Sequence, residues 1–258
     1  MADKREIAES LYRALERGTS DDVLSILSER LSGERTEKLH LSRTPVLVSI
    51  GRELGKLLSG RAWKFDRFRE LWKLSYSRKQ LLAQGLVSGR EVRLIIIGAL
   101  GVFSKKEYES TKSFVLDMAD TIQDWETCDQ MALRVMVNLA IQNRDEILAI
   151  LRRWLHSGNK WVRRLAIATI PPYIRAREEE ADTCLEIIGD AMEEEDREVR
   201  KAIGWALREV SKKDWAAVFE FLRRWVADGD RNTMQIIKDG MKKLPKEKQD
   251  ELRQLMGN

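Results

Sequence analysis

The chain has 258 residues, which is enough for one large domain or two small ones with a substantial buried core. Its Lys and Arg residues exceed its Asp and Glu residues by 46 to 42, and the net charge of +4 permits nucleic-acid binding without indicating it. Two cysteines exclude a disulfide framework or a four-cysteine metal site, and no stretch approaches the roughly 20 apolar residues of a membrane-spanning helix, so we expect a soluble, cytoplasmic protein.

Residues 1–60 are expected to form a helical cap. Amphipathic stretches at 5–17 and 20–31 predict two helices, a polar loop follows them, and a third helix opens at Arg43. The charged residues of the first stretch would supply the polar outer surface that the end of a repeat array needs.

From residue 61 to 243 one short pattern recurs about every 35 residues. Copies that read Val-Arg followed by an apolar run begin at Val92, Val162 and Val199, and a degenerate copy is expected at 128–136. Second amphipathic segments alternate with these copies, at 65–74, 114–122, 146–155, 184–192 and 218–226. Helix pairs at this interval predict an all-α, HEAT-like helical-repeat solenoid, in which neighbouring pairs stack into one continuous core.

Helix ends are predicted at 157–159, at Pro171-Pro172 and at 228–230, because glycine favours the end of a helix and proline interrupts it. Residues 244–258 are expected to form a tail with a last short helix. We therefore expect a single HEAT-like domain over residues 1–258, composed of the cap, the repeats and the tail.

Successive inner helices of such a solenoid line one concave surface, so side chains at the same phase of those helices share a groove. Tryptophan recurs there three or four residues from a charged side chain: Trp125 with Asp129, Trp161 with Arg164, and Trp205 with Arg208. Aromatic rings beside guanidinium groups suit a sugar-phosphate backbone. The single carboxylate would repel DNA unless it had a task, such as stabilising a positive charge that develops during a reaction.

Three segments resemble the signature segments of the AlkD-type DNA alkylation repair family: Asp-Trp-Glu-Thr-Cys-Asp at 124–129, Ser-Gly-Asn-Lys-Trp-Val-Arg-Arg at 157–164, and Val-Arg-Lys-Ala-Ile-Gly-Trp-Ala-Leu-Arg-Glu at 199–209. Residues 43–47 resemble the family's N-terminal motif, so the resemblance extends over about residues 40–225. It implies a solenoid with a concave DNA-binding groove. It also implies a DNA glycosylase of base excision repair, which hydrolyses the N-glycosidic bond of cationic N3- or N7-alkylated purines without extruding the base.

The resemblance assigns roles to individual residues. Asp129 matches the family's catalytic aspartate, Trp125 and Trp205 match its two groove tryptophans, and Arg164 matches its phosphate-contacting arginine. An alkylated purine already carries a positive charge and leaves readily, so the enzyme must stabilise an oxocarbenium-like sugar and position water. We add three further arginines as phosphate contacts: Arg208, Arg163 and Arg43. The expected partner is double-stranded DNA with alkylated bases, bound by a monomer, with no metal ion and no cofactor.

The sequence departs from the family pattern at three positions. Glu126 replaces the usual aspartate after the first tryptophan, Val48 occupies a position that is often basic, and Trp215 replaces a common proline. These departures bear on the substrate range and leave the proposed site intact.

Structural interpretations compete with these assignments. Asp129 could be a solvated surface carboxylate or form a salt bridge with Arg134. Cys128 is expected to be a small apolar residue on the buried side, since no histidine accompanies it. His40 and His156 accompany no cluster of cysteines or carboxylates, so zinc ligation is not expected. The remaining tryptophans are interpreted as packing residues: Trp63, Trp72, Trp154, Trp161, Trp215 and Trp225. The acidic runs at 178–180 and 193–196 are expected on solvated outer surfaces.

Two other functions remain open on the sequence. A non-catalytic HEAT-repeat binder of distorted or branched DNA would keep the basic groove and tolerate the loss of Asp129, so the presence of this residue favours the enzyme. A protein-binding scaffold would not require tryptophan beside a charged residue on three helices.

Overall fold

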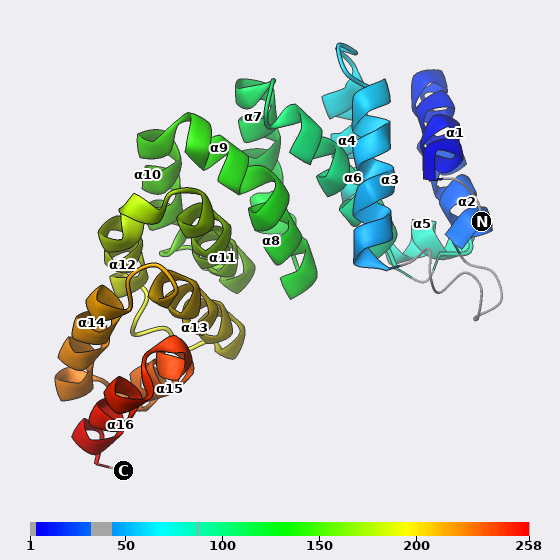
Figure 1. The fold of residues 1–258 in the computed structure, drawn as a ribbon. Helices are drawn as coiled ribbons and strands as arrows, with labels where there is room; N and C mark the ends of the chain where they lie inside the picture. The colour runs from blue at the N-terminus through cyan, green and yellow to red at the C-terminus, as the bar shows by residue number, and fades with distance from the viewer. Residues whose placement is uncertain (1–3, 32–42, 87, 258) are drawn as a thin grey trace. The chain divides into compact units, whose positions relative to one another are not determined.

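The computed structural model describes residues 4–31, 43–86 and 88–257, and throughout these ranges the regular elements are helices (Figure 1). The chain forms two compact units, Met1–Thr121 and Ile122–Asn258. The prediction of an all-α helical-repeat fold is confirmed, whereas the single-domain organisation stays a prediction. Within the described residues, no helix combines the length and the apolar character that a bilayer crossing requires.

The first unit contains the N-terminal helices and the first helix pairs. Its helices are α1 (Lys4–Arg17), α2 (Ser20–Leu31), α3 (Thr44–Leu57), α4 (Lys64–Leu74), α5 (Arg78–Ala83), α6 (Arg90–Phe103) and α7 (Tyr108–Met118), followed by the 3₁₀ turn η2 (Ala119–Thr121). The two predicted N-terminal helices and the helix that opens after Arg43 are confirmed. The predicted polar loop at 32–42 lies outside the described residues.

Helices α3 and α6 cross with their backbones in contact. A Cβ atom on Gly51 would lie 2.1 Å from the carbonyl oxygen of Ile95, and one on Gly98 would lie 2.4 Å from the carbonyl oxygen of Val48. No side chain fits at either position, because interiors are packed to near-crystalline density. Val48, expected at a position that is often basic, is therefore a core residue here.

The second unit is a stack of helix pairs in two rows (Figure 1). The inner row consists of α8 (Trp125–Met131), η3 (Ala132–Met136), α9 (Val137–Gln142), α11 (Lys160–Ala176), α13 (Arg197–Ser211) and α15 (Arg231–Gly240). The outer row consists of α10 (Arg144–Trp154), α12 (Ala181–Gly189), α14 (Trp215–Asp228) and α16 (Lys246–Leu255). Helix α11 packs between α8 and α13, and α13 packs against α15. The predicted pairing of inner and outer helices is confirmed, as is the last short helix of the tail.

The first inner helix of this unit contains a wide turn. Segments α8, η3 and α9 follow one another without a gap, and η3 is a π-helical turn at Ala132–Met136. A π turn holds one more residue than an α turn. The side chains before it therefore point in a different direction, relative to those after it, than they would in an uninterrupted α-helix of the same sequence. Asp129 lies just before this turn.

The predicted helix end at Pro171-Pro172 is wrong. Both prolines are buried inside α11, which continues to Ala176. Proline removes an amide donor and usually ends a helix. Here α11 is held between α8 and α13. Tertiary packing thus overrides the local preference.

Ion pairs join consecutive helix pairs of the second unit at a sequence separation close to one repeat. Between outer helices, Arg152 contacts Glu186 and Asp190, each at 2.9 Å. Between inner helices, Arg175 lies 3.4 Å from Glu209. Each such pair couples a residue of one repeat to the next repeat, so the repeats are connected by charge as well as by their apolar core.

Candidate functional site

The inner helices of the second unit begin at capped N-termini. The caps are Asp124, which accepts from the Thr127 amide at 2.8 Å, Asn159, which accepts from the Trp161 amide at 2.9 Å, and Asp196, which accepts from the Glu198 amide at 2.8 Å. A short polar side chain at this position satisfies an amide that has no partner within the helix. The caps fix where each helix starts and so place three side chains in the first turns: Trp125, Trp161 and Glu198.

Asp129 and Arg164 form a bidentate pair between α8 and α11. Arg164 Nε donates to Asp129 Oδ1 at 3.0 Å, and Arg164 Nη2 donates to Oδ2 at 2.9 Å. The Arg164 side chain is 7% exposed and that of Asp129 is 15% exposed. The carboxylate is thus bound across repeats, whereas Arg134, the alternative partner on the same helix, donates its Nε–H to Gln130 Oε1 at 3.3 Å. A guanidinium and a carboxylate in this fork geometry hold each other in a fixed orientation.

Arg164 also reaches the third inner helix. Its Nη1 donates to the Glu198 carbonyl oxygen at 2.5 Å and lies 3.9 Å from Glu198 Oε2. Glu198 Oε1 in turn accepts from Lys201 Nζ at 2.6 Å. Four charges of alternating sign therefore run from α8 through α11 to α13. Sequence reasoning did not find Glu198, and its only local signal is a position seven residues before Trp205, which places both on one face of the helix.

The environment changes the proton affinity of Asp129. Burial raises the pKa of its carboxyl group, because the charged form loses solvation. The hydrogen bonds and the charge of Arg164 act in the opposite direction, and the carboxylates of Asp124 and Glu198 add to the increase. The group is thus a carboxylate held in place by one cation and surrounded by further negative charge.

Cys128, next to Asp129, has no role as a nucleophile. It is fully buried, its Sγ donates to the Trp161 carbonyl oxygen at 3.3 Å, and burial raises the pKa of its thiol. A thiolate is needed for nucleophilic attack, and this thiol stays protonated. The prediction of a small residue on the buried side of the helix is confirmed.

The two candidate groove tryptophans differ in exposure. Trp125 is 55% exposed, which is unusual for so large an apolar side chain. Trp205 is half-buried and shares a face of α13 with Lys201 and Arg208. Trp161 is half-buried, with the Lys160 ammonium 5.0 Å from its ring centroid. Of these three rings, the exposed ring of Trp125 is the most available to a partner.

The tryptophans interpreted as packing residues range from fully buried to exposed. Trp72 is fully buried and donates its indole N–H to Thr121 Oγ1 at 2.8 Å, as expected for a core residue. Trp63, Trp154 and Trp225 are half-buried. The prediction is wrong for Trp215, which occupies the first position of α14 and is 45% exposed.

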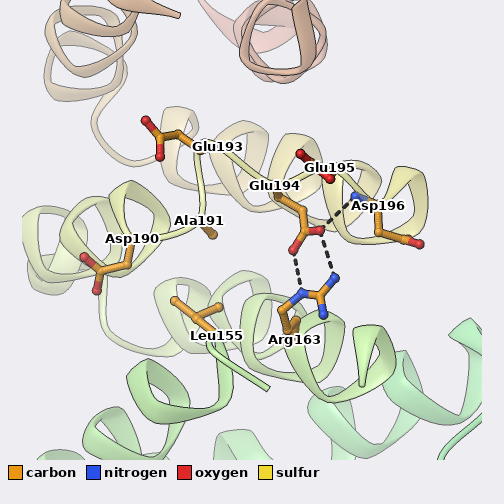
Figure 2. A pocket seen from close by; sticks show the side chains of 8 residues that line it. All are labelled: Leu155, Arg163, Asp190, Ala191, Glu193, Glu194, Glu195 and Asp196. Carbon is orange, nitrogen blue, oxygen red and sulfur yellow. Dashed lines mark hydrogen bonds and ion pairs between the residues drawn. The ribbon is translucent and has the colours of Figure 1, made fainter. Parts of the chain in front are cut away.

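Arg163 lies in an acidic cavity of about 560 Å³. Its guanidinium makes a bidentate pair with Glu194, at 2.7 and 3.0 Å, and donates to the Ser157 carbonyl at 2.8 Å. Figure 2 shows this pair among the other lining residues, Leu155, Asp190, Ala191, Glu193, Glu195 and Asp196. Glu194 is only 9% exposed, so the prediction of a solvated acidic run is wrong for this residue. A phosphate contact by Arg163 would have to compete with this carboxylate.

The other two arginines have different surroundings. Arg208 is 26% exposed, and its Nη1 donates to the Asp239 carbonyl at 3.2 Å. Arg43 is exposed at the N-terminus of α3, in the first unit. His156 is exposed and His40 lies outside the described residues, among which no group of three or more His, Cys, Asp or Glu side chains is arranged to hold a metal ion.

Two solved structures are similar in fold. One is AlkD2 from Streptococcus mutans, which is 20% identical with a TM-score of 0.62, where the match covers 88% of this chain and 99% of that one. The other is smu.31 from Streptococcus mutans UA159, also 20% identical, with a TM-score of 0.61 and coverage of 88% and 100%. A comparison with curated proteins gave no significant match.

The model of one protein family matches most of the sequence. The model of the family described as DNA alkylation repair enzyme matches residues 42–244, which include the three signature segments and the Asp129–Arg164 pair. The protein belongs to the DNA alkylation repair enzyme family.

Proposed function

We propose that the protein is a DNA glycosylase that hydrolyses the N-glycosidic bond of cationic N3- or N7-alkylated purines in duplex DNA. The observation that carries this proposal is the Asp129 carboxylate, fixed by Arg164 and located one helical turn from the exposed Trp125. A preorganised charge beside an exposed aromatic ring can act on a sugar that the ring contacts.

The reaction needs little from the protein besides charge and position. The bond between C1′ and the purine nitrogen breaks, its electron pair neutralises the cationic base, and positive charge develops on the sugar. Asp129 stabilises this charge and orients the water whose oxygen bonds to C1′ while its proton passes to solvent. Arg164 occupies one lone pair of each carboxylate oxygen, which leaves the others directed elsewhere.

The same residues support binding to the duplex. Trp125 and Trp205 pack against sugars around the lesion, and Arg208 contacts a phosphate together with Arg164, whose two terminal nitrogens each keep an N–H group beyond those used by Asp129 and Glu198. Arg163 and Arg43 are proposed as further phosphate contacts. The protein acts as a monomer and needs no metal ion.

Release of free base from methylated duplex DNA tests the proposal. Purified protein is incubated with DNA that contains 7-methylguanine and 3-methyladenine, and released bases are quantified by chromatography. The wild type should release base and the Asp129→Asn variant should not. Duplex binding without release by the wild type would refute the glycosylase and favour a non-catalytic DNA-binding role.

A further inference from the structure

We propose that Glu198 is a positioning residue of the same site, an inference that rests on the proposed glycosylase function. Glu198 offsets the charge of Arg164 and so sets the net negative charge that the site presents to a cationic lesion. Its backbone carbonyl accepts from Arg164 Nη1 at 2.5 Å, and its Oε2 lies 3.9 Å from the same nitrogen. Arg164 therefore lies between two carboxylates on two different helices.

The need for a second carboxylate follows from the geometry of the first. Asp129 and Arg164 are in direct contact, so their opposite charges largely cancel at the distance of a bound sugar. An ion pair with no net charge attracts an oxocarbenium-like centre only weakly. Glu198 adds a negative charge on the other side of the guanidinium and restores a net negative charge to the group.

Lys201 links the net negative charge of this group to the binding of DNA. Its ammonium holds Glu198 Oε1 at 2.6 Å, but its side chain is 48% exposed, whereas that of Glu198 is 26% exposed. A flexible, exposed lysine exchanges partners easily when a phosphate approaches. Once Lys201 turns to the DNA backbone, the charge of Glu198 is no longer compensated, so duplex binding strengthens the negative field at Asp129.

The charged groups that face Asp129 come from three helices. Burial raises the pKa of its carboxyl group, Arg164 on α11 lowers it, and Asp124 at the start of α8 and Glu198 on α13 raise it further. The adjacent Cys128 thiol is protonated. Removing the charge of Glu198 should therefore lower the pKa of Asp129, and removing the charge of Lys201 should raise it.

Three substitutions in the full-length protein separate charge from shape. Glu198→Gln removes the charge and leaves the backbone carbonyl that binds Arg164, Glu198→Asp keeps the charge, and Lys201→Gln removes the counter-charge. Glu186→Gln is the matched control, because Glu186 also joins two repeats through an arginine, Arg152, but lies in the outer row. Each variant is measured by single-turnover release of 7-methylguanine across pH and by NMR titration of the Asp129 carboxyl carbon.

We expect Glu198→Gln to slow release roughly tenfold and to move the acid limb of the rate profile and the Asp129 titration to lower pH. Glu198→Asp should restore most of the rate, and Lys201→Gln should move both curves to higher pH. The control should match the wild type.

The inference would be overturned if the rate profile and the titration curve of Glu198→Gln coincided with those of the wild type. It would also be overturned if the curves of Lys201→Gln moved to lower pH. A wild type that releases no base would overturn the proposed function and, with it, the positioning role of Glu198 in catalysis. The NMR titration distinguishes the two failures, because it reports the coupling between Glu198 and Asp129 without catalysis.

Discussion

Asp129 receives two hydrogen bonds from Arg164, a residue 35 positions later in the chain. The separation is close to one repeat, so the direction of this carboxylate is set by the stacking of one helix pair on the next. Any change that shifts α11 against α8 will reorient the proposed catalytic group without touching it.

Asp129→Asn separates chemistry from binding. Asparagine keeps the shape but removes the charge that opposes the positive sugar, so we expect excision of a cationic purine to fall on the order of 100- to 1,000-fold, by analogy with the loss of one oxyanion-hole donor. Duplex affinity should equal or exceed that of the wild type, since a carboxylate near phosphates disfavours binding. Release assays and fluorescence anisotropy measure the two quantities, and wild-type excision by the variant would rule out the carboxylate mechanism.

The pH dependence of excision follows from the surroundings of Asp129. The carboxylate must be ionised to act, and its pKa is raised by burial, so the rate should fall as pH decreases through a value above the ordinary range of aspartate. Arg164→Gln removes the cation that opposes this increase and should move the acid limb to still higher pH. Single-turnover rates of both proteins across pH check the direction, and a shift to lower pH would contradict it.

Duplex binding should weaken steeply with salt and depend little on sequence. Cationic side chains that contact phosphates release counterions, so the logarithm of the association constant falls linearly with that of the salt concentration. Arg208→Gln should reduce this slope by about one unit if the residue contacts one phosphate. Arg223→Gln on the outer row, where Arg223 is bound to Glu220, serves as the control, and equal slopes for both variants would remove Arg208 from the DNA contact.

Trp125→Ala should affect DNA binding and excision, whereas Trp72→Ala should affect the stability of the fold. Trp125 is 55% exposed, so its removal should leave the free energy of unfolding nearly unchanged and weaken both duplex binding and excision. Trp72 is fully buried, and its removal should cost about 3–5 kcal/mol of stability. Denaturant unfolding and anisotropy measure these effects, and strong destabilisation by Trp125→Ala would assign that ring to the core.

Gly51→Ala should destabilise the first unit although alanine is the better helix former. The added Cβ would lie 2.1 Å from the Ile95 carbonyl oxygen, so α3 and α6 must separate, at a cost of about 1–3 kcal/mol. Gly158→Ala is the control, because apart from its chain neighbours no residue of the described chain lies within 4 Å of its added Cβ. Thermal unfolding compares the two variants, and equal midpoints would show that the crossing adapts.

The sequence predicts those features that depend on short-range spacing. The interval between the Val-Arg copies predicted the helix pairs, and the offset between Trp125 and Asp129 predicted a shared face. Contacts between repeats leave no such local trace. Glu198 was missed because its contact with Arg164 joins two helices, and Arg134 was considered for Asp129 because it lies on the same helix.

Two further differences between the predicted and the observed structure also arise from contacts that the local sequence does not show. Pro171 and Pro172 are signals for a helix end, but the helices on both sides of α11 hold the chain helical through them. Trp215 is a large apolar residue for which burial is the general expectation, yet its place at the first turn of α14 leaves it exposed. Local preferences decide an element only where its neighbours do not constrain it.

The π turn at Ala132–Met136 has a consequence for how the site can be lost. A π turn accommodates one extra residue by widening, so deleting one residue there would convert the turn to regular α-helix and leave the flanking segments nearly in phase. In regular α-helix the loss of one residue instead rotates everything before it by about 100°. A single-codon deletion in the π turn should therefore leave Asp129 directed at Arg164, whereas the same deletion in α11 just after Arg164 would turn that side chain away from Asp129.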